Sequence, residues 1–116
     1  MSEFKDCLCK IRDLQHRISE FEQQLESRFG ISLNEGMVLC SLSSTGCLTC
    51  GNIANMMTIT SSNCSKVVSK VEAKGLIFRT LGKEDKREMI FELTPAGKEL
   101  IDRINASDIS FGKLPL

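Results

Sequence analysis

The side chains with the most reactive chemistry in this 116-residue chain are six cysteines and a single histidine. Two of the cysteines form the motif Cys47-Leu-Thr-Cys50, which has the spacing of a redox pair or of half a zinc site. A thioredoxin-type redox pair belongs to a βαβ unit, and a structural zinc ion takes four ligands. Since the sequence predicts neither arrangement, we expect no metal site and no thioredoxin-type dithiol here.

The positions of the cysteines within predicted helices separate structural thiols from exposed ones. Cys7, Cys50 and Cys64 fall on apolar helix faces, where cysteine packs as a small hydrophobic residue. We interpret these three as structural. Cys47 is predicted to lie in a turn, and the pattern around Cys40 does not decide its environment.

Cys9 lies on the outer face of the first predicted helix, which it shares with His16. It is the best single candidate for a redox-sensing thiol, and Cys47 is the rival candidate. The alternative is that this exposed cysteine has no role. Catalysis is not expected, because His16 lies on an exposed helix face without a nearby nucleophile and orienting group. The sequence also contains no glycine-rich phosphate loop and no paired-carboxylate motif. We therefore expect neither an enzyme nor a cofactor.

Positive charge gathers in one part of a chain whose formal net charge is zero. Residues 61–91 contain seven basic and four acidic side chains, whereas residues 31–60 contain a single charged residue, Glu35. This local surplus of positive charge is modest, and it is consistent with binding to a nucleic acid. The absence of Trp and Tyr argues against the stacking platforms that bind single strands.

The composition indicates one soluble domain. Hydrophobic residues make up 41% and charged residues 26% of the sequence, the balance of a globular protein of this length. No stretch approaches the ~20 apolar residues of a membrane-spanning helix, so no membrane partner is expected. The first residues do not form a secretory signal, and we expect the cysteines to lie in the reducing cytoplasm.

The spacing of apolar residues predicts a long first helix. They recur in steps of three and four from Phe4 to Phe29, and Gly30 ends the pattern. This stripe is longer than a helix of a single domain needs, so we expect part of it to pack against a second chain. Ser32-Leu-Asn-Glu35 is a capping box that begins a second helix, and residues 43–46 are predicted to form a turn.

The remaining elements follow in a recognisable order. Thr49 and Thr60 are N-caps of two short helices joined by a tight link. Residues 76–81 and 89–93 are then predicted to be strands around a polar turn, and Thr94 caps a last helix that runs to about residue 105. The tail, residues 107–116, is predicted to be loose.

This order predicts a mostly α, α+β winged helix-turn-helix, with a two-stranded wing. Residues 1–106 form its single domain, with the helix-turn-helix at 49–75, the wing at 76–94 and dimerisation helices at about 3–29 and 95–106. The second helix of the pair fits a major groove, and the basic hairpin can reach phosphates or the minor groove. The candidate DNA contacts are Ser62, Asn63, Ser65, Lys66, Ser69, Lys70, Lys83, Asp85, Lys86 and Arg87.

Several segments resemble the MarR family of winged-helix transcription factors. Leu48-Thr-Cys-Gly-Asn-Ile-Ala resembles the first helix of the pair, and Val67 to Arg79 resembles the recognition helix and its exit. Asp85-Lys-Arg87 is similar to the Asp-x-Arg signature of the wing, and Leu93-Thr-Pro-Ala-Gly97 to a Leu-Thr-x-x-Gly segment. The resemblance runs without gaps from about residue 29 to 104.

The resemblance implies a homodimer that binds a pseudo-palindromic operator and represses transcription until a small ligand or an oxidant releases it. It also implies that Arg87 enters the minor groove and that Asp85 orients it. Two alternatives stay open: a winged-helix module that binds only proteins, and a thiol-based sensor that uses Cys9.

Three departures from the family pattern change these expectations. Gly36 stands where the family has a bulky residue, and we expect a neighbouring side chain to fill the gap, with a ligand pocket as the alternative. Only 19 residues follow Gly97, so we expect either that the first helix carries more of the dimer interface or that the dimer is weaker or differently arranged. The recognition helix has no arginine before Arg79, which leaves Asn63 to read adenine and Lys66 to reach guanine.

Overall fold

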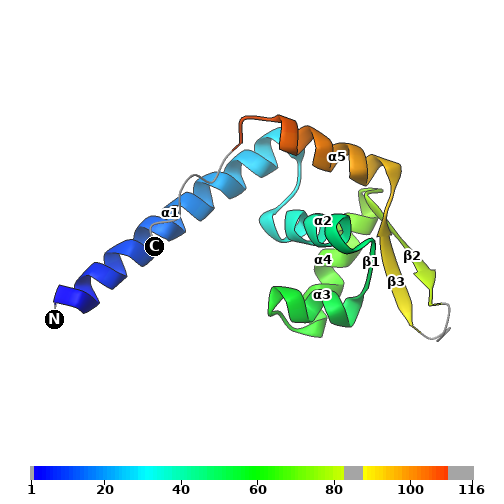
Figure 1. Ribbon diagram of the computed structural model, residues 1–116, viewed down its shortest axis with the longest axis horizontal. Coiled ribbons are helices and arrows are strands. Elements are labelled where there is room, and N and C mark those ends of the chain that lie inside the picture. The colour runs from blue at the N-terminus through cyan, green and yellow to red at the C-terminus, as the bar shows by residue number, and fades with distance from the viewer. Residues whose placement is uncertain (1, 83–87, 110–116) are drawn as a thin grey trace.

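The computed structural model describes residues 2–82 and 88–109, and it has the shape of a compact body with one projecting helical arm (Figure 1). The elements are α1 (Ser2–Phe29), α2 (Leu33–Thr45), β1 (Cys47–Thr49), α3 (Cys50–Met57), α4 (Ser61–Ala73), β2 (Ile77–Leu81), β3 (Met89–Leu93) and α5 (Pro95–Ala106). The arm is α1, and all other elements form the body or cover it. Within the described residues, no helix is long and apolar enough to cross a membrane.

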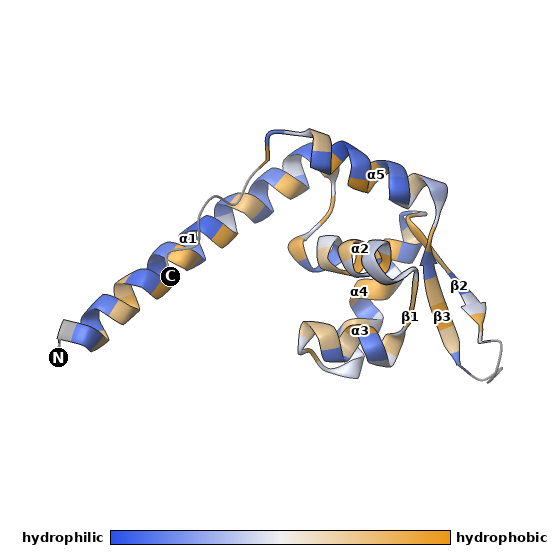
Figure 2. Ribbon diagram, viewed as in Figure 1, coloured by the Kyte–Doolittle hydropathy of each residue, from blue (hydrophilic) through white to orange (hydrophobic). Residues whose placement is uncertain are grey.

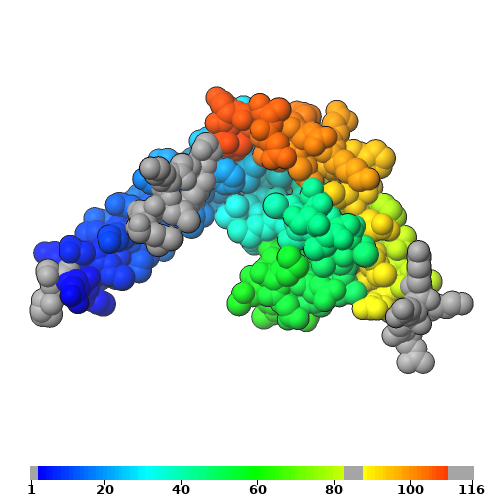
Figure 3. Space-filling view, viewed as in Figure 1, coloured from blue at the N-terminus to red at the C-terminus, as the bar shows by residue number. Residues whose placement is uncertain are grey.

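Helix α1 is the predicted long helix, but only its C-terminal part packs against the body. Leu25 is 3% exposed, whereas Phe4 is 70% and Leu8 50% exposed. Figure 2 shows hydrophobic residues along the projecting arm, and Figure 3 shows the arm leaving the body. Cys7, interpreted above as a structural thiol, is exposed with the rest of this stripe in the single chain. Gly30 ends the helix with a φ of 72°, a conformation that glycine adopts without strain.

The predicted capping box begins α2. The Ser32 hydroxyl accepts the Glu35 N–H at 3.2 Å, and the Glu35 carboxylate accepts the Ser32 N–H at 2.8 Å. The turn predicted at residues 43–46 is wrong, because α2 continues to Thr45 and only Gly46 leaves the helix. The Thr45 hydroxyl donates to the Ser41 carbonyl at 2.9 Å, so this polar side chain is satisfied within the helix.

Among the described residues, the sheet has three strands in the order β1-β3-β2, all antiparallel (Figure 1). The two-stranded wing is confirmed as β2 and β3, but the sequence analysis missed β1. The prediction that Cys47 lies in a turn is wrong, because Cys47 pairs with Glu92 of β3. A three-residue strand is too short to show a period in sequence, and its pairing with β3 defines it.

The core lies where the helix pair, α2 and the sheet meet. Thr49 and Thr60 cap α3 and α4 as predicted, and Thr58 makes the turn between them with a φ of 55°. The side chains that fill the core are almost fully buried and come from α2, α3, α4, β2, β3 and α5: Val38, Leu39, Leu42, Ile53, Cys64, Val68, Val71, Ile77, Phe91 and Leu100. Burial of this apolar face holds α4 against the rest of the body.

The junction between α4, β2 and α5 explains the Leu93-Thr-Pro-Ala-Gly97 segment. The Thr94 hydroxyl donates to the Gly75 carbonyl at 2.7 Å, and the Thr94 N–H donates to the Leu76 carbonyl at 3.0 Å. These bonds draw α5 so close that a Cβ on Gly97 would lie 2.1 Å from the Leu76 carbonyl oxygen. Only glycine fits there, so Gly97 fixes how closely α5 approaches the end of α4.

Candidate nucleic-acid interface and adjoining pocket

Helix α4 has one buried face and one exposed polar face. Cys64, Val68 and Val71 anchor it in the core. The six candidate DNA contacts on this helix are all exposed: Ser62, Asn63, Ser65, Lys66, Ser69 and Lys70. Within the described part of the chain, neither Lys66 nor Lys70 has an ion-pair partner. Their positive charge is thus available on the surface, beside small side chains that allow close approach to a groove.

The four candidate residues of the wing, Lys83, Asp85, Lys86 and Arg87, lie outside the described residues. The structure does show where their segment begins and ends. The Gly82 N–H donates to the Glu88 carbonyl at 2.7 Å, so the two ends of the turn lie side by side.

Arg79 positions the wing against α4. Its guanidinium donates to both carboxylate oxygens of Glu72, at 2.7 and 2.5 Å, and lies 5.4 Å from the centroid of the Phe91 ring. Hydrogen bonding from Arg79 lowers the pKa of Glu72, and hydrogen bonding to Glu72 raises that of Arg79. This pair is a positioning contact that the sequence analysis missed. The sequence signal for this pair is the opposite charge of Glu72 and Arg79 on the two sides of Gly75.

A second ion pair ties α4 to α2. The Lys74 ammonium lies 2.7 Å from one oxygen of the buried Glu35 carboxylate, and it also donates to the Gly30 carbonyl at 2.9 Å. Burial raises the pKa of Glu35, but hydrogen bonds from Lys74 and Ser32 lower it by more than burial raises it. The pKa of Glu35 therefore lies below its ordinary value. Lys74 and Arg79 thus hold α4 in place, while Lys66 and Lys70 face solvent.

The sequence model of the MarR family matches residues 31–89, from just before α2 to the first residue of β3. The chain belongs to the MarR family. A curated relative, the uncharacterized HTH-type transcriptional regulator YhjH of Bacillus subtilis (strain 168), is 28% identical over 87 residues. That match covers 75% of this MarR-family chain and 50% of YhjH, so the chain spans about half the length of this relative.

Solved structures of MarR-type regulators share the fold. The transcriptional regulator BldR of Sulfolobus solfataricus superposes with a TM-score of 0.78 and 26% identity, over 90% of this chain and 74% of BldR. A mutant of E. coli MarR complexed with operator DNA gives a TM-score of 0.74 at 21% identity, over 80% and 66% of the two chains. At that identity the second comparison shows the fold alone.

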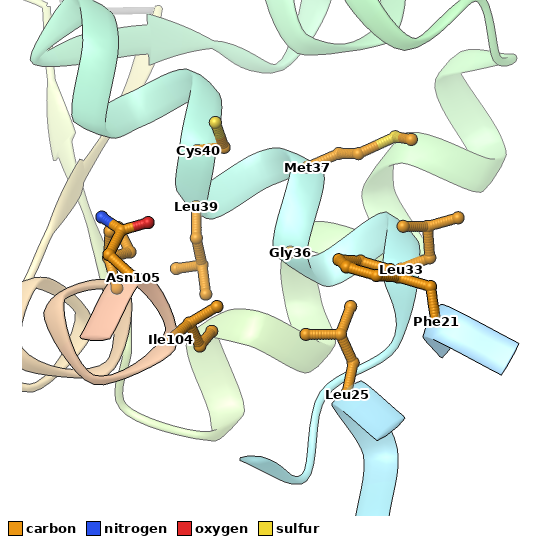
Figure 4. Close-up of a pocket in the computed structure, with 10 residues that line it drawn as sticks. Phe21, Leu25, Leu33, Gly36, Met37, Leu39, Cys40, Ile104 and Asn105 are labelled. Atoms are coloured by element: carbon orange, nitrogen blue, oxygen red, sulfur yellow. The ribbon is translucent and has the colours of Figure 1, made fainter. Parts of the chain in front are cut away.

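An apolar pocket of about 260 Å³ lies between the end of α1, α2 and α5 of this MarR-family chain (Figure 4). It is lined by Phe21, Leu25, Leu33, Gly36, Met37, Leu39, Cys40, Ile101, Ile104 and Asn105. Gly36 lines this pocket, the alternative that the sequence analysis kept open, and neighbouring side chains also reach the gap beside it. The nearest side-chain atoms to a Cβ built there would be Ile31 Cδ1 at 3.7 Å and Leu25 Cδ1 at 3.8 Å. These are ordinary van der Waals distances, so the side chains of Ile31 and Leu25 occupy one side of the gap.

The cysteines differ in their surroundings. Cys9 is exposed as predicted, and the Arg12 guanidinium lies 3.7 Å from its sulfur. Cys40 and Cys47 are also exposed, whereas Cys64 is buried and Cys50 half-buried. Among the residues that the structure describes, no group of three or more His, Cys, Asp or Glu side chains is placed to hold a metal ion.

Proposed function

We propose that this MarR-family chain binds duplex DNA as a homodimer, through α4 and the wing, and regulates transcription in the cytoplasm. The observation that carries the proposal is the exposed polar face of α4, with Lys66 and Lys70 unpaired among the described residues. Phosphates supply much of the affinity of such a site, and base edges supply the sequence preference. The E. coli MarR mutant of the same fold is complexed with operator DNA.

The side chains of α4 divide these two tasks. Asn63 has the donor and acceptor pair that matches an adenine edge, and Lys66 is a point donor for guanine or a phosphate. The serines at 62, 65 and 69 are short enough to let the helix enter the groove. In the wing, we assign Arg87 to the minor groove, with Lys83 and Lys86 on phosphates and Asp85 orienting Arg87.

The arm supports the dimer. Its exposed stripe, with Phe4, Leu8, Ile11 and Ile18 at 70%, 50%, 47% and 37%, has no partner in the described part of the single chain. Contiguous exposed apolar surface of this kind marks an interaction site. A second copy of the same arm, together with α5, would cover it. Two-fold symmetry then places two α4 helices on one duplex, with half-sites about one helical turn apart.

The pocket supports regulation by a small apolar ligand. Its walls belong to the arm on one side and to the body on the other (Figure 4). A ligand bound there would change the angle between them and hence the spacing of the two α4 helices. Repression relieved by such a ligand is the mode of regulation that we propose, with Cys9 as the redox-sensing alternative.

The test is binding of the purified chain to the DNA upstream of its own gene, followed by fluorescence anisotropy. We expect tighter binding to that DNA than to a scrambled duplex of equal composition. Replacing Lys66 and Lys70 by Ala should weaken binding and reduce the slope of log affinity against log salt by about 0.9 for each phosphate that the variant no longer neutralises. Lys98→Ala on α5 removes the same kind of charge elsewhere and serves as the control.

Equal weakening in Lys98→Ala and in the α4 variant would contradict the proposal. So would equal affinity for the upstream and scrambled duplexes, with a salt slope that none of the variants changes. Retention of a protein partner without DNA binding would favour the protein-interaction alternative.

A further inference from the structure

Two thiols meet where α3 and α4 pack together. Cys50 is the first residue of α3 and Cys64 lies in the first turns of α4, and their sulfur atoms are 3.3 Å apart. The Cys64 thiol also lies 3.4 Å from the Cys50 carbonyl oxygen, to which it donates. Cys64 is fully buried, whereas Cys50 is half-buried. The pair therefore has one member that solvent reaches and one that it does not.

This geometry is close to that of a disulfide. An S–S bond is about 2.05 Å long, so the two sulfurs need to approach by about 1.2 Å. The two residues are 14 positions apart in the chain, and the turn between the helices brings them together. Both were interpreted from sequence as small hydrophobic residues, and that interpretation does not require their sulfurs to touch.

We propose that Cys50 and Cys64 are a modification site, which a hydroperoxide oxidises to an intramolecular disulfide between the two helices of the helix-turn-helix. In the first step the Cys50 sulfur attacks the outer peroxide oxygen, the O–O bond breaks, and the alkoxide leaves as an alcohol with the proton of the Cys50 thiol. The product is a sulfenic acid on Cys50. In the second step the Cys64 sulfur attacks the Cys50 sulfur, the S–O bond breaks, and hydroxide leaves with the Cys64 proton as water. The dithiol loses two electrons, which reduce the peroxide.

The surroundings assign the order of these steps. Cys50 is the thiol that an oxidant reaches from solvent. Burial, together with the neighbouring Cys50, raises the pKa of Cys64 to about 12, so Cys64 stays a protonated thiol until it attacks. The largest cause of the raised pKa of Arg79 is its hydrogen bond to Glu72. Electrostatic attraction to a Cys50 thiolate also raises this pKa. The half-buried Cys50 thiol is thus oxidised first, and the buried Cys64 thiol closes the bond.

Closing the bond would change the DNA-reading surface, a step that rests on the proposed function. Ser62, Asn63 and Ser65 surround Cys64 on α4 and are exposed. Drawing Cys64 toward α3 shifts this turn of the helix relative to the wing, which Arg79 and Glu72 hold against the other end of α4. We expect the oxidised protein to bind its DNA about tenfold more weakly, within the usual range of coupling between two sites.

The disulfide is tested by mass spectrometry of the purified full chain after treatment with one equivalent of cumene hydroperoxide and alkylation of free thiols. Cyanogen bromide cuts after methionine and separates residues 38–56, which contain Cys40, Cys47 and Cys50, from residues 58–89, which contain Cys64. A bond between Cys50 and Cys64 joins the two fragments until they are reduced. A bond between Cys47 and Cys50 does not join them.

Joined fragments are expected from the unchanged protein and from the matched controls Cys40→Ser and Cys47→Ser. They should be absent from Cys50→Ser, and Cys64→Ala should instead leave a sulfenic acid on Cys50 that dimedone traps. Separate fragments from the oxidised unchanged protein would overturn the proposal. So would joined fragments that persist in Cys50→Ser.

DNA binding gives the second readout. The oxidised protein should lose about tenfold in affinity and regain it with dithiothreitol, while Cys50→Ser should not respond to peroxide. A disulfide that leaves affinity unchanged would overturn the effect on DNA. If the reduced protein does not bind DNA at all, the proposed function fails, and the mass measurement still decides the modification site.

Discussion

The body and the arm differ in the burial of their apolar residues. In the body each helix contributes buried apolar residues to the core, and residues such as Val38 and Val71 are completely buried. On the arm the same spacing of apolar residues leaves Phe4 and Leu8 in solvent. The body thus has a hydrophobic core of its own, whereas the apolar face of the arm needs a second surface to cover it. A shared periodicity therefore predicts a helix in both regions, but it does not say which molecule covers the helix.

The largest expected effect comes from a change inside the body. Gly97→Ala places a methyl group against the Leu76 carbonyl, and the displaced α5 should cost about 3 kcal/mol of the free energy of unfolding. Urea denaturation measures this loss. Gly51→Ala is the matched control, because a Cβ there meets only the Thr49 hydroxyl at 3.8 Å. Equal stability of the two variants would show that α5 does not depend on the close approach at Gly97.

The next effect concerns the arm and leaves the body intact. Ile11→Ser removes an apolar side chain that we expect to be buried between two arms, at a cost of about 2 kcal/mol in dimer association. This corresponds to an association constant about thirtyfold lower, measured by sedimentation equilibrium. His16→Ser on the outer face of the same helix should leave association unchanged. A protein that is monomeric at micromolar concentration while it still binds DNA would contradict the role of the arm.

A smaller, pH-dependent effect concerns the ion pair that ties α4 to α2. Because the folded pKa of Glu35 lies below its ordinary value of 4.5, its contribution to stability is present above about that pH. The contribution is lost as the pH falls through the folded pKa. Glu35→Gln should cost about 1 to 2 kcal/mol at neutral pH and flatten the acid side of the stability curve, measured by thermal unfolding from pH 3 to 7. Glu99→Gln, on α5, is the control, and an acid limb unchanged in Glu35→Gln would exclude this pair as its cause.

The smallest effect lies at the boundary between body and arm. Gly36→Ala should stabilise α2 by about 0.5 to 1 kcal/mol, because glycine is a poor residue in a helix interior. The added methyl group also narrows the apolar pocket, so binding of an apolar fluorescent dye should weaken. Gly51→Ala should give a similar gain in stability and leave dye binding unchanged. Dye binding that responds equally to both substitutions would place the dye elsewhere.

The local sequence determined most of the helices and strands, because helix caps, glycine stops and apolar periods involve residues only three or four positions apart. The capping box of Ser32 and Glu35, the N-cap of Thr49 and the stop at Gly30 all form as predicted. The exposed face of α4 followed from the helical period, since Cys64 and Val68 are buried on its opposite side. The order of the elements then placed this helix within a winged helix-turn-helix, and the family pattern agreed with it.

Only the tertiary structure decided the features that depend on residues far apart in the chain. Strand β1 exists because Cys47 finds a partner in β3, and three residues are too few to show a period. The pocket beside Gly36 depends on where α1 and α5 lie, and the Arg79 and Lys74 ion pairs depend on how α4 meets β2 and α2. The contact between Cys50 and Cys64 has the same origin. A helical period fixes the direction of each side chain, but the packing of two helices fixes which side chains meet.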